Sequence, residues 1–160
     1  MIEDIIVKKG KKNFYNINVK DGEDYKNLVV FLKDCFVPFG IEEYNKKYIL
    51  NFEVDKTSEF YSLMRTLESK ILELLPEDDK FELKSVFHKK PKFNLLCKAH
   101  LKSNTNLMIT KYIIDKNEIS VFELIKAKKY NLELEISGMW TFKDSVGFYL
   151  NINKISTNNI

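Results

Sequence analysis

The chain has 160 residues, of which 44% are hydrophobic and 31% are charged, and its formal net charge is +3 at pH 7. This length suits one domain with a real core and is too short for two ordinary domains. No apolar run approaches the roughly 20 residues that a membrane-spanning helix needs. We therefore expect a single soluble globular domain without a membrane partner, and the small net charge does not by itself indicate a polyanionic ligand.

The N-terminal residues and the cysteines both predict an intracellular protein. Residues 1–12 place acids first, a short apolar run next and lysines last, which is the wrong order for a secretory signal. Cys35 and Cys97 are too few for a disulfide framework, and each lies in an apolar stretch where a thiol behaves as a small hydrophobic group. We expect a reducing compartment, such as the cytoplasm, a viral replication site or the nucleus, and no secretion.

Periodicity in the first half of the chain predicts three strands. Residues 14–20 alternate, with Phe14 and the polar residues on a solvated face. Residues 27–40 are almost continuously apolar and predict a more deeply buried strand. Residues 48–54 alternate again, so that Asn51 should lie outside the core.

A helix is the most clearly marked element. Apolar residues recur at helical spacing over about 58–75, Thr57 or Ser58 is placed to cap the N-terminus, and Pro76 ends the pattern. We expect the apolar stripe to pack on the sheet and not to form a partner-binding groove, because a helix beside strands normally buries its apolar face on them. The stripe comprises Phe60, Leu63, Met64, Leu67, Ile71, Leu74 and Leu75.

The second half of the chain is rich in strands. Residues 81–114 predict two or three strands, and residues 130–155 predict a hairpin that turns near Lys143. Between them, the spacing of Ser120 and Glu123 is that of a capping box and predicts a short helix near 120–127. One central helix among many strands favours a curved antiparallel sheet or barrel of the mainly β class with α over a parallel fold, which would need more helices. The expected boundaries are an N-terminal lead at 1–12, a single domain at 13–155 and a frayed C-terminus at 156–160.

The sequence lacks the common motifs of catalysis. It contains no phosphate loop, no nucleophile elbow, no His-Glu-x-x-His and no Cys-x-x-Cys pair. Cys97 and His100 lie three residues apart in a predicted strand, where such side chains point to opposite faces, so they cannot readily share a zinc ion. We therefore expect neither an enzyme nor a bound metal or cofactor.

Lysines gather where acids are missing. No acid occurs between Ser85 and Ile114, and the even-numbered positions of a predicted strand there place Lys98, His100 and Lys102 on one face. Such a face suits a phosphate backbone, whereas the alternative is that the lysines only keep an exposed surface soluble. The other basic residues of this interval are His88, Lys89, Lys90, Lys92 and Lys111.

Aromatic side chains accompany these lysines. Alternation places Phe14 and Tyr149 on the solvated faces of their strands, beside asparagines. Flat rings near lysines are typical of single-strand binding, where stacking contributes about 1 to 3 kcal/mol per base without sequence readout, although rings also serve as cross-strand packing pairs. Because Arg65 is the only arginine, bidentate readout of guanine in a duplex is disfavoured.

Trp140, the only tryptophan, has two alternative positions. It shares even numbering with Leu134 and Ile136, so an unbroken strand would point it into the core. Only a bulge at Gly138 would turn it to the outer face, where it would be a stacking platform. We expect the core position, which makes Tyr149 the better candidate for contact with a base.

The order of these features resembles that of the single-stranded DNA-binding proteins of large DNA viruses and some phages, which are built on an OB-fold. The likeness covers roughly residues 13–155, and its last part is an alternating strand, Gly138, an apolar residue, Trp140, a short turn and Gly147 before the final strand. The resemblance implies an OB-fold-like domain and sequence-independent coating of single-stranded DNA in replication, recombination or repair, without a cofactor. The stretches that carry it are residues 37–55, 60–75, 92–106 and 119–155.

The resemblance also implies partners and a groove. Single-stranded DNA is the expected ligand, and replication proteins and further copies of the chain are other expected partners. Such proteins often end in an acidic tail that recruits partners, whereas no acid follows Asp144 here, so recruitment would use another surface or a tail outside this sequence. A protein-interaction or assembly subunit with the same sheet and an RNA-binding variant are the alternatives, since stacking and lysine contacts do not test for the 2′-hydroxyl. The predicted site comprises Phe14, Lys20, Lys89, Lys90, Lys92, Lys98, His100, Lys102, Trp140, Lys143 and Tyr149.

Overall fold

The computed structural model describes residues 5–9, 14–21, 24–74, 81–104 and 107–157, and for residues 8, 9, 20, 21, 72 and 74 it describes the backbone alone. Most of these residues lie in strands, so the mainly β class with one helix is confirmed. The elements are β1 (Ile5–Lys9), β2 (Phe14–Asp21), β3 (Asp24–Lys26), β4 (Leu28–Val37), β5 (Ile41–Tyr44), β6 (Lys47–Glu53), α1 (Glu59–Leu74), β7 (Glu82–Leu83), β8 (Phe87–His88), β9 (Leu96–Leu101), β10 (Ser103–Asn104), β11 (Leu107–Met108), β12 (Lys111–Ile114), β13 (Asn117–Ile119), the 3₁₀ turn η2 (Val121–Glu123), β14 (Lys128–Phe142) and β15 (Ser145–Ser156).

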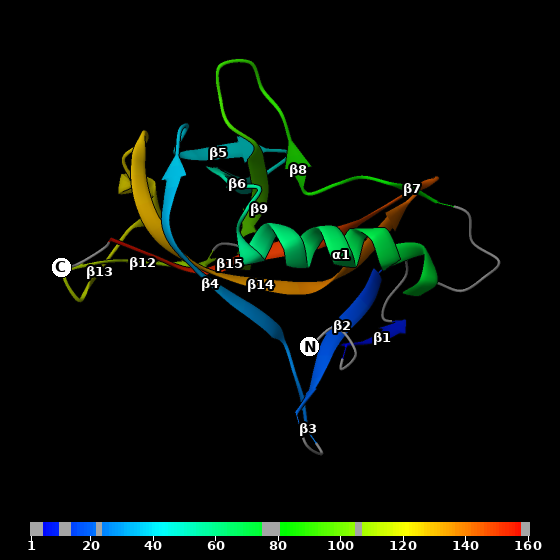
Figure 1. The fold of residues 1–160 in the computed structure, drawn as a ribbon. Coiled ribbons are helices and arrows are strands. Elements are labelled where there is room, and N and C mark those ends of the chain that lie inside the picture. The colour runs from blue at the N-terminus through cyan, green and yellow to red at the C-terminus, as the bar shows by residue number, and fades with distance from the viewer. Residues whose placement is uncertain (1–4, 10–13, 22–23, 75–80, 105–106, 158–160) are drawn as a thin grey trace.

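A long hairpin of β14 and β15 forms the centre of one large curved sheet (Figure 1). The main path through the sheet is β1-β2-β14-β15-β9-β6-β5, and β4 pairs with the first part of β14. Most pairs are antiparallel, as predicted, but β15 pairs in parallel with β7, β9 and β12. Among the described residues, β4 pairs with β14 alone and not with the nearby β6, so the sheet curves without closing.

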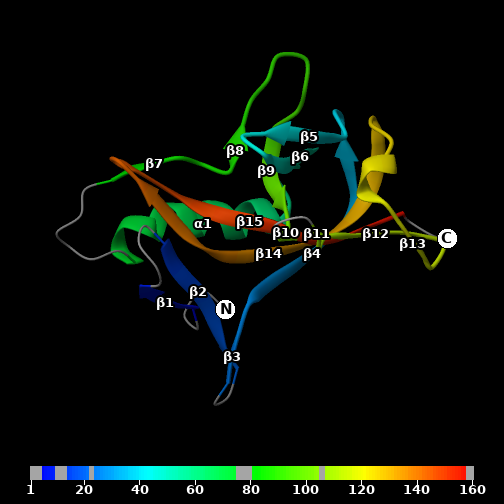
Figure 2. The ribbon, with the colours of Figure 1, turned by 180° about the vertical axis from the view of Figure 1, so that it is seen from behind.

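The helix α1 lies across the curved sheet, as both ribbon views show (Figures 1 and 2). It begins at Glu59 because the Ser58 hydroxyl accepts a hydrogen bond from the Tyr61 backbone N–H at 3.1 Å, which is N-capping. Its apolar stripe joins the core, as predicted, with Met64 and Ile71 almost fully buried. No helix in the described part of the chain is both long enough and apolar enough to cross a bilayer.

The core lies between α1 and the inner face of the sheet, which we define as the face whose side chains join the core. We call the opposite face the outer face. Burying these apolar side chains is the main stabilising contribution to the fold, at roughly 25 cal/mol per Å² of apolar surface. The largest fully buried side chains are Ile17, Leu50, Phe52, Met64, Leu67, Ile71, Leu96, Tyr130, Leu132, Leu134, Ile136 and Met139.

One prediction about burial is wrong, and one residue predicted to lie outside the core is covered. The apolar run of β4 is not deeply buried: Phe31 is 72% exposed, and Lys33 and Asp34 are exposed as well. The reason is that, in the described part of the chain, β4 pairs with β14 along one edge alone. Asn51 lies on the face opposite to the core residues Leu50 and Phe52, as predicted, but it is only 3% exposed, and its amide donates a hydrogen bond to the Glu42 carboxylate at 2.9 Å.

Two local elements differ from the predicted ones. The helix expected near 120–127 is the single turn η2, whose N-cap Ser120 accepts from the Phe122 backbone N–H. It ends there because the Tyr130 hydroxyl donates to the Ile125 carbonyl and accepts from the Ile125 N–H, which holds the following residues extended. Strand β1, which pairs along β2, was not among the predicted strands.

Candidate nucleic-acid interface

A bulge in β14 decides where Trp140 points. Ile136 pairs with Leu150 and Gly138 pairs with Tyr149, so Ser137 is an extra residue that shifts the register by one. The Asn151 side-chain amide holds the bulge by donating to the Ser137 hydroxyl at 2.8 Å. The expectation of a core position for Trp140 is therefore wrong, and the bulge alternative is right, because Trp140 lies half-buried on the outer face.

Two glycines let aromatic rings lie flat on the outer face. A Cβ atom added to Gly138 would lie 2.5 Å from Cζ of Phe14, and one added to Gly147 would lie 2.6 Å from Cζ2 of Trp140. No side chain fits between a ring and a backbone at such distances, so each ring rests directly on a glycine. The spacing of Gly138, Trp140 and Gly147 noted in the sequence thus has a packing cause.

Four rings from four adjacent strands form one surface, which we call the aromatic face: Phe14 of β2, Trp140 of β14, Tyr149 of β15 and His100 of β9. The ring centroids of Phe14 and Tyr149 are 5.6 Å apart, and those of His100 and Tyr149 are 5.7 Å apart. Cross-strand pairing of Trp140 with Phe14 brings the fourth ring alongside. The predicted outward orientations of Phe14, His100 and Tyr149 are confirmed, since the described neighbours of each in sequence are buried.

Cations border the aromatic face. Lys47 Nζ lies 6.0 Å from the Tyr149 ring centroid, and the exposed Lys98 precedes His100 on the same face of β9. Lys84 follows β7, where its backbone N–H donates to the Val146 carbonyl at 2.8 Å. Its Nζ lies 3.4 Å from the Glu82 carboxylate, but both side chains are exposed, and an exposed pair of this kind is weak. Sequence reasoning missed Lys47 and Lys84, although the alternation of β6 gives Lys47 the same outward parity as residues 49 and 51.

Two of the predicted cations carry no free charge. Burial and the nearby Lys98 and Lys47 lower the pKa of His100 to about 4, so its ring is neutral at pH 7. Lys102 forms an ion pair with the buried Glu135, so its charge is compensated within the protein. The predicted cationic face of β9 is therefore reduced to Lys98, because burial and pairing are not visible in strand alternation.

The other predicted lysines whose side chains are described belong to loops and not to the strands of the aromatic face. Lys89, Lys90 and Lys92 belong to the loop between β8 and β9, which projects from the sheet in Figures 1 and 2. There, Lys90 Nζ lies 4.7 Å from the Phe39 ring centroid. Lys143 lies at the tip of the β14–β15 hairpin, where its Nζ is 5.4 Å from the ring centroid of the exposed Phe142. The side chain of Lys20 is outside the described residues.

A buried carboxylate positions the chain segment that lies beside Trp140 and lines a cavity there. Glu68 of α1 is 2% exposed, and its two oxygens accept hydrogen bonds at 2.8 Å from the Val86 N–H and the Ser85 hydroxyl. These bonds hold the segment after β7 against β9 and β15, where it closes one side of a cavity of about 250 Å³. Sequence reasoning missed Glu68, but helical spacing signals it, because Glu68 lies four residues after Met64, within the apolar stripe.

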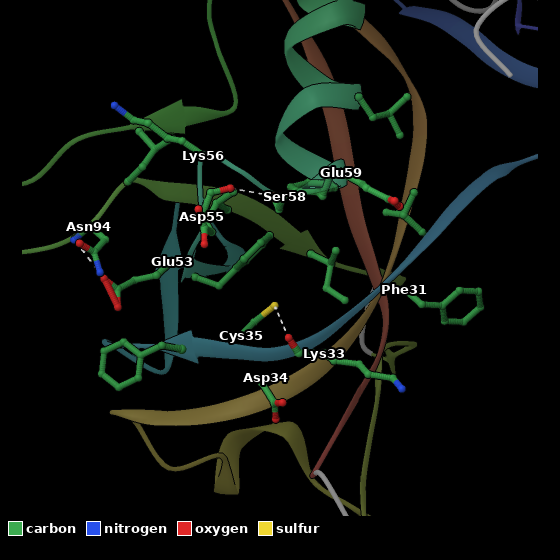
Figure 3. Close-up of a pocket in the computed structure, with 18 of the residues that line it drawn as sticks. Phe31, Lys33, Asp34, Cys35, Glu53, Asp55, Lys56, Ser58, Glu59 and Asn94 are labelled. Carbon is green, nitrogen blue, oxygen red and sulfur yellow. Dashed lines mark hydrogen bonds between the residues drawn. The ribbon is translucent and has the colours of Figure 1, made fainter.

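A larger cavity, about 1280 Å³ in volume, lies elsewhere, between β4, the residues after β6 and the start of α1 (Figure 3). Two of its carboxylates are already used within the protein: Asp55 accepts from the N–H and hydroxyl of Thr57, and Glu53 accepts from the Asn94 N–H. Burial raises the pKa of Cys35 to about 12, so its thiol is protonated and unreactive. We therefore place the candidate interface on the aromatic face and not in this cavity.

Metal chemistry has no site among the described residues. No group of three or more His, Cys, Asp or Glu side chains in that part of the chain is arranged to hold an ion. Cys97 is fully buried on the inner face, while His100 lies on the outer face of the same strand.

Comparison with known proteins identifies the fold. No sequence-family model matches the chain, and no curated protein sequence is significantly similar to it. Among solved structures, a C-terminally truncated single-stranded DNA-binding protein from bacteriophage Enc34 matches with a TM-score of 0.60 at 9% identity, over 99% of this chain and 95% of that one. The single-stranded DNA-binding protein gp2.5 of bacteriophage T7 matches with a TM-score of 0.53 at 7% identity, over 82% and 92%. The Enc34 protein has also been solved in complex with single-stranded DNA. The chain therefore has the fold of phage single-stranded DNA-binding proteins.

Proposed function

We propose that the aromatic face binds single-stranded DNA without sequence readout, in DNA replication, recombination or repair. The observation that carries this proposal is the convergence of Phe14, His100, Trp140 and Tyr149 on one solvent-facing surface. The similarity in fold to phage proteins that are described as single-stranded DNA-binding supports it.

The geometry of the rings favours unpaired bases. Because neighbouring centroids are only 5.6 and 5.7 Å apart, the rings already touch one another, and a base lies on them and not between them. Stacking of this kind contributes about 1 to 3 kcal/mol per base and accepts any base. In a duplex the base faces are covered by their neighbours, so the same surface offers a duplex only charge contacts.

Lysines at the border supply the electrostatic part of binding. Lys47, Lys84 and Lys98 lie around the rings, within reach of the phosphates of a strand whose bases stack there. Each phosphate that a lysine neutralises releases counterions, which makes the affinity fall as salt rises.

The test is a titration of labelled oligonucleotides of mixed sequence, followed by anisotropy and by Trp140 fluorescence at low and high salt. We expect single-stranded DNA to bind with micromolar or tighter affinity, to quench Trp140 and to be released by salt, and we expect the duplex to bind more weakly. Tyr149→Ala should lower the affinity by about 5- to 150-fold, whereas Phe122→Ala, which removes an exposed ring on η2, should not. No binding of the single strand at low salt would overturn the proposal, and tighter binding of RNA of the same sequence would favour the RNA alternative.

A further inference from the structure

The cavity of about 250 Å³ beside Trp140 combines rings with polar side chains. Trp140, Tyr149 and Phe148 supply apolar surface, and Lys84, Lys98 and His100 supply polar groups. At about 30 Å³ per water molecule, its volume corresponds to roughly eight waters, which is enough for one nucleobase. It opens beside the aromatic face, because Trp140, Tyr149 and His100 belong to both.

His100 offers this cavity a hydrogen-bond acceptor. Hydrogen bonding to the Leu150 backbone acts on the pKa of His100 in the direction that favours the protonated ring. The ring is nevertheless neutral at pH 7, since burial and the neighbouring lysines outweigh that bond. A neutral imidazole with one N–H donating has an unprotonated second nitrogen, which can only accept.

We propose that this cavity is a subsite for one unpaired nucleotide, in which the free ring nitrogen of His100 accepts a hydrogen bond from the base edge while Lys84 and Lys98 contact the adjoining phosphate. This inference rests on the proposed function and specifies how the same surface distinguishes single strands from duplexes. Lysine is only a donor, so Lys84 and Lys98 suit phosphate oxygens, whereas the neutral His100 ring can accept from a base edge. The Ser85 hydroxyl, which also lines the cavity, is already used within the protein, since it donates to Glu68 and accepts from the Phe87 N–H.

A hydrogen-bond acceptor at His100 accounts both for the lack of base preference and for the preference for single strands over duplexes. Every one of the four bases carries at least one N–H on its Watson–Crick edge, either an amino group or a ring N–H, so a single acceptor accommodates all of them. In a duplex those same N–H groups are already donated to the opposite base. An acceptor in a cavity that holds one base therefore favours an unpaired base of any identity over a paired one.

The test uses a base without any N–H. Thymine methylated at N3 keeps its ring and both carbonyls but has lost its only donor. Wild-type protein should bind a thymidine dodecamer about 2- to 10-fold more tightly than the N3-methylated dodecamer, the range expected for one neutral hydrogen bond. His100→Phe keeps a ring on the face without the acceptor and should abolish that difference, whereas His100→Gln retains an acceptor oxygen and should preserve it.

The outcomes separate this inference from the proposed function. If wild-type protein binds both dodecamers equally, or if folded His100→Phe keeps the full difference, the His100 subsite is wrong although single-strand binding stands. If neither dodecamer binds at low salt, the proposed function itself fails. The phosphate contact is tested separately: Lys84→Ala should reduce the slope of log affinity against log salt by about 0.7, whereas the matched Lys90→Ala should leave it unchanged.

Discussion

Replacing Gly147 by alanine should displace the Trp140 ring from its position against residue 147 on the aromatic face. The new Cβ would lie 2.6 Å from Cζ2 and 2.8 Å from Cε2 of Trp140, and 2.9 Å from the carbonyl oxygen of Lys84. Contacts this short require the ring to move, because the other neighbour is backbone held by the β7–β15 pairing. Overpacking of this kind costs about 1 to 3 kcal/mol in the free energy of unfolding, or roughly 2–4 °C in Tm per kcal/mol for a chain of this size.

The same displacement should weaken DNA binding. If Trp140 stacks one base, its loss from the surface costs about 1 to 3 kcal/mol of binding free energy, which is about 5- to 150-fold in Kd. Urea unfolding gives the stability, and anisotropy of a labelled single strand gives the affinity, both for wild type and for Gly147→Ala.

A double-mutant cycle isolates the role of the ring. In a Trp140→Ala background the clash with the indole no longer exists, so Gly147→Ala should cost much less stability and no further affinity. The reasoning is refuted if the stability penalty is the same in both backgrounds, because the contact that matters would then be the Lys84 carbonyl and not the ring. It is refuted equally if Gly147→Ala leaves the affinity of wild type unchanged.

Three further predictions follow from the site and its supports. Lys98→Ala should reduce the salt slope of single-strand binding by about 0.7, whereas Lys90→Ala, in the projecting loop, should not; equal slopes would remove Lys98 from the interface. Because the pKa of His100 is lowered to about 4 in the folded protein from its usual 6.5, the unfolded chain binds more protons between these values. The stability that neutral His100 contributes is therefore complete above about pH 6.5 and is lost as the pH falls toward 4. The free energy of unfolding in urea should fall more from pH 7 to pH 5 for wild type than for His100→Phe. An NMR titration that gives His100 a pKa near 6.5 would contradict this. Glu68→Gln should lower the free energy of unfolding in urea by about 1 to 3 kcal/mol, because the Val86 N–H loses a charged acceptor. The control is Glu73→Gln at an exposed position of the same helix, which should stay within about 0.5 kcal/mol of wild type, as expected for a surface change.

Much of the architecture follows from local periodicity. The 3.6-residue spacing in 58–75 predicts α1, and alternation in β2, β9 and β15 predicts which side chains face outward, including Phe14 and Tyr149. These predictions succeed because the period of a strand or helix is a property of the backbone itself. The resemblance in the order of motifs led to the same fold that the structural comparisons show.

The sequence by itself therefore determined the helix α1, the longer strands, the mainly β class and most of the rings, whereas the tertiary structure decided which groups meet. A single extra residue, Ser137, reverses the face of Trp140, and whether a bulge forms depends on the hydrogen bonds of the partner strand. Likewise, Glu135 neutralises Lys102 from a strand more than 30 residues away, and burial leaves His100 uncharged. Register, burial and charge pairing are long-range relations, so alternation along one strand does not contain them.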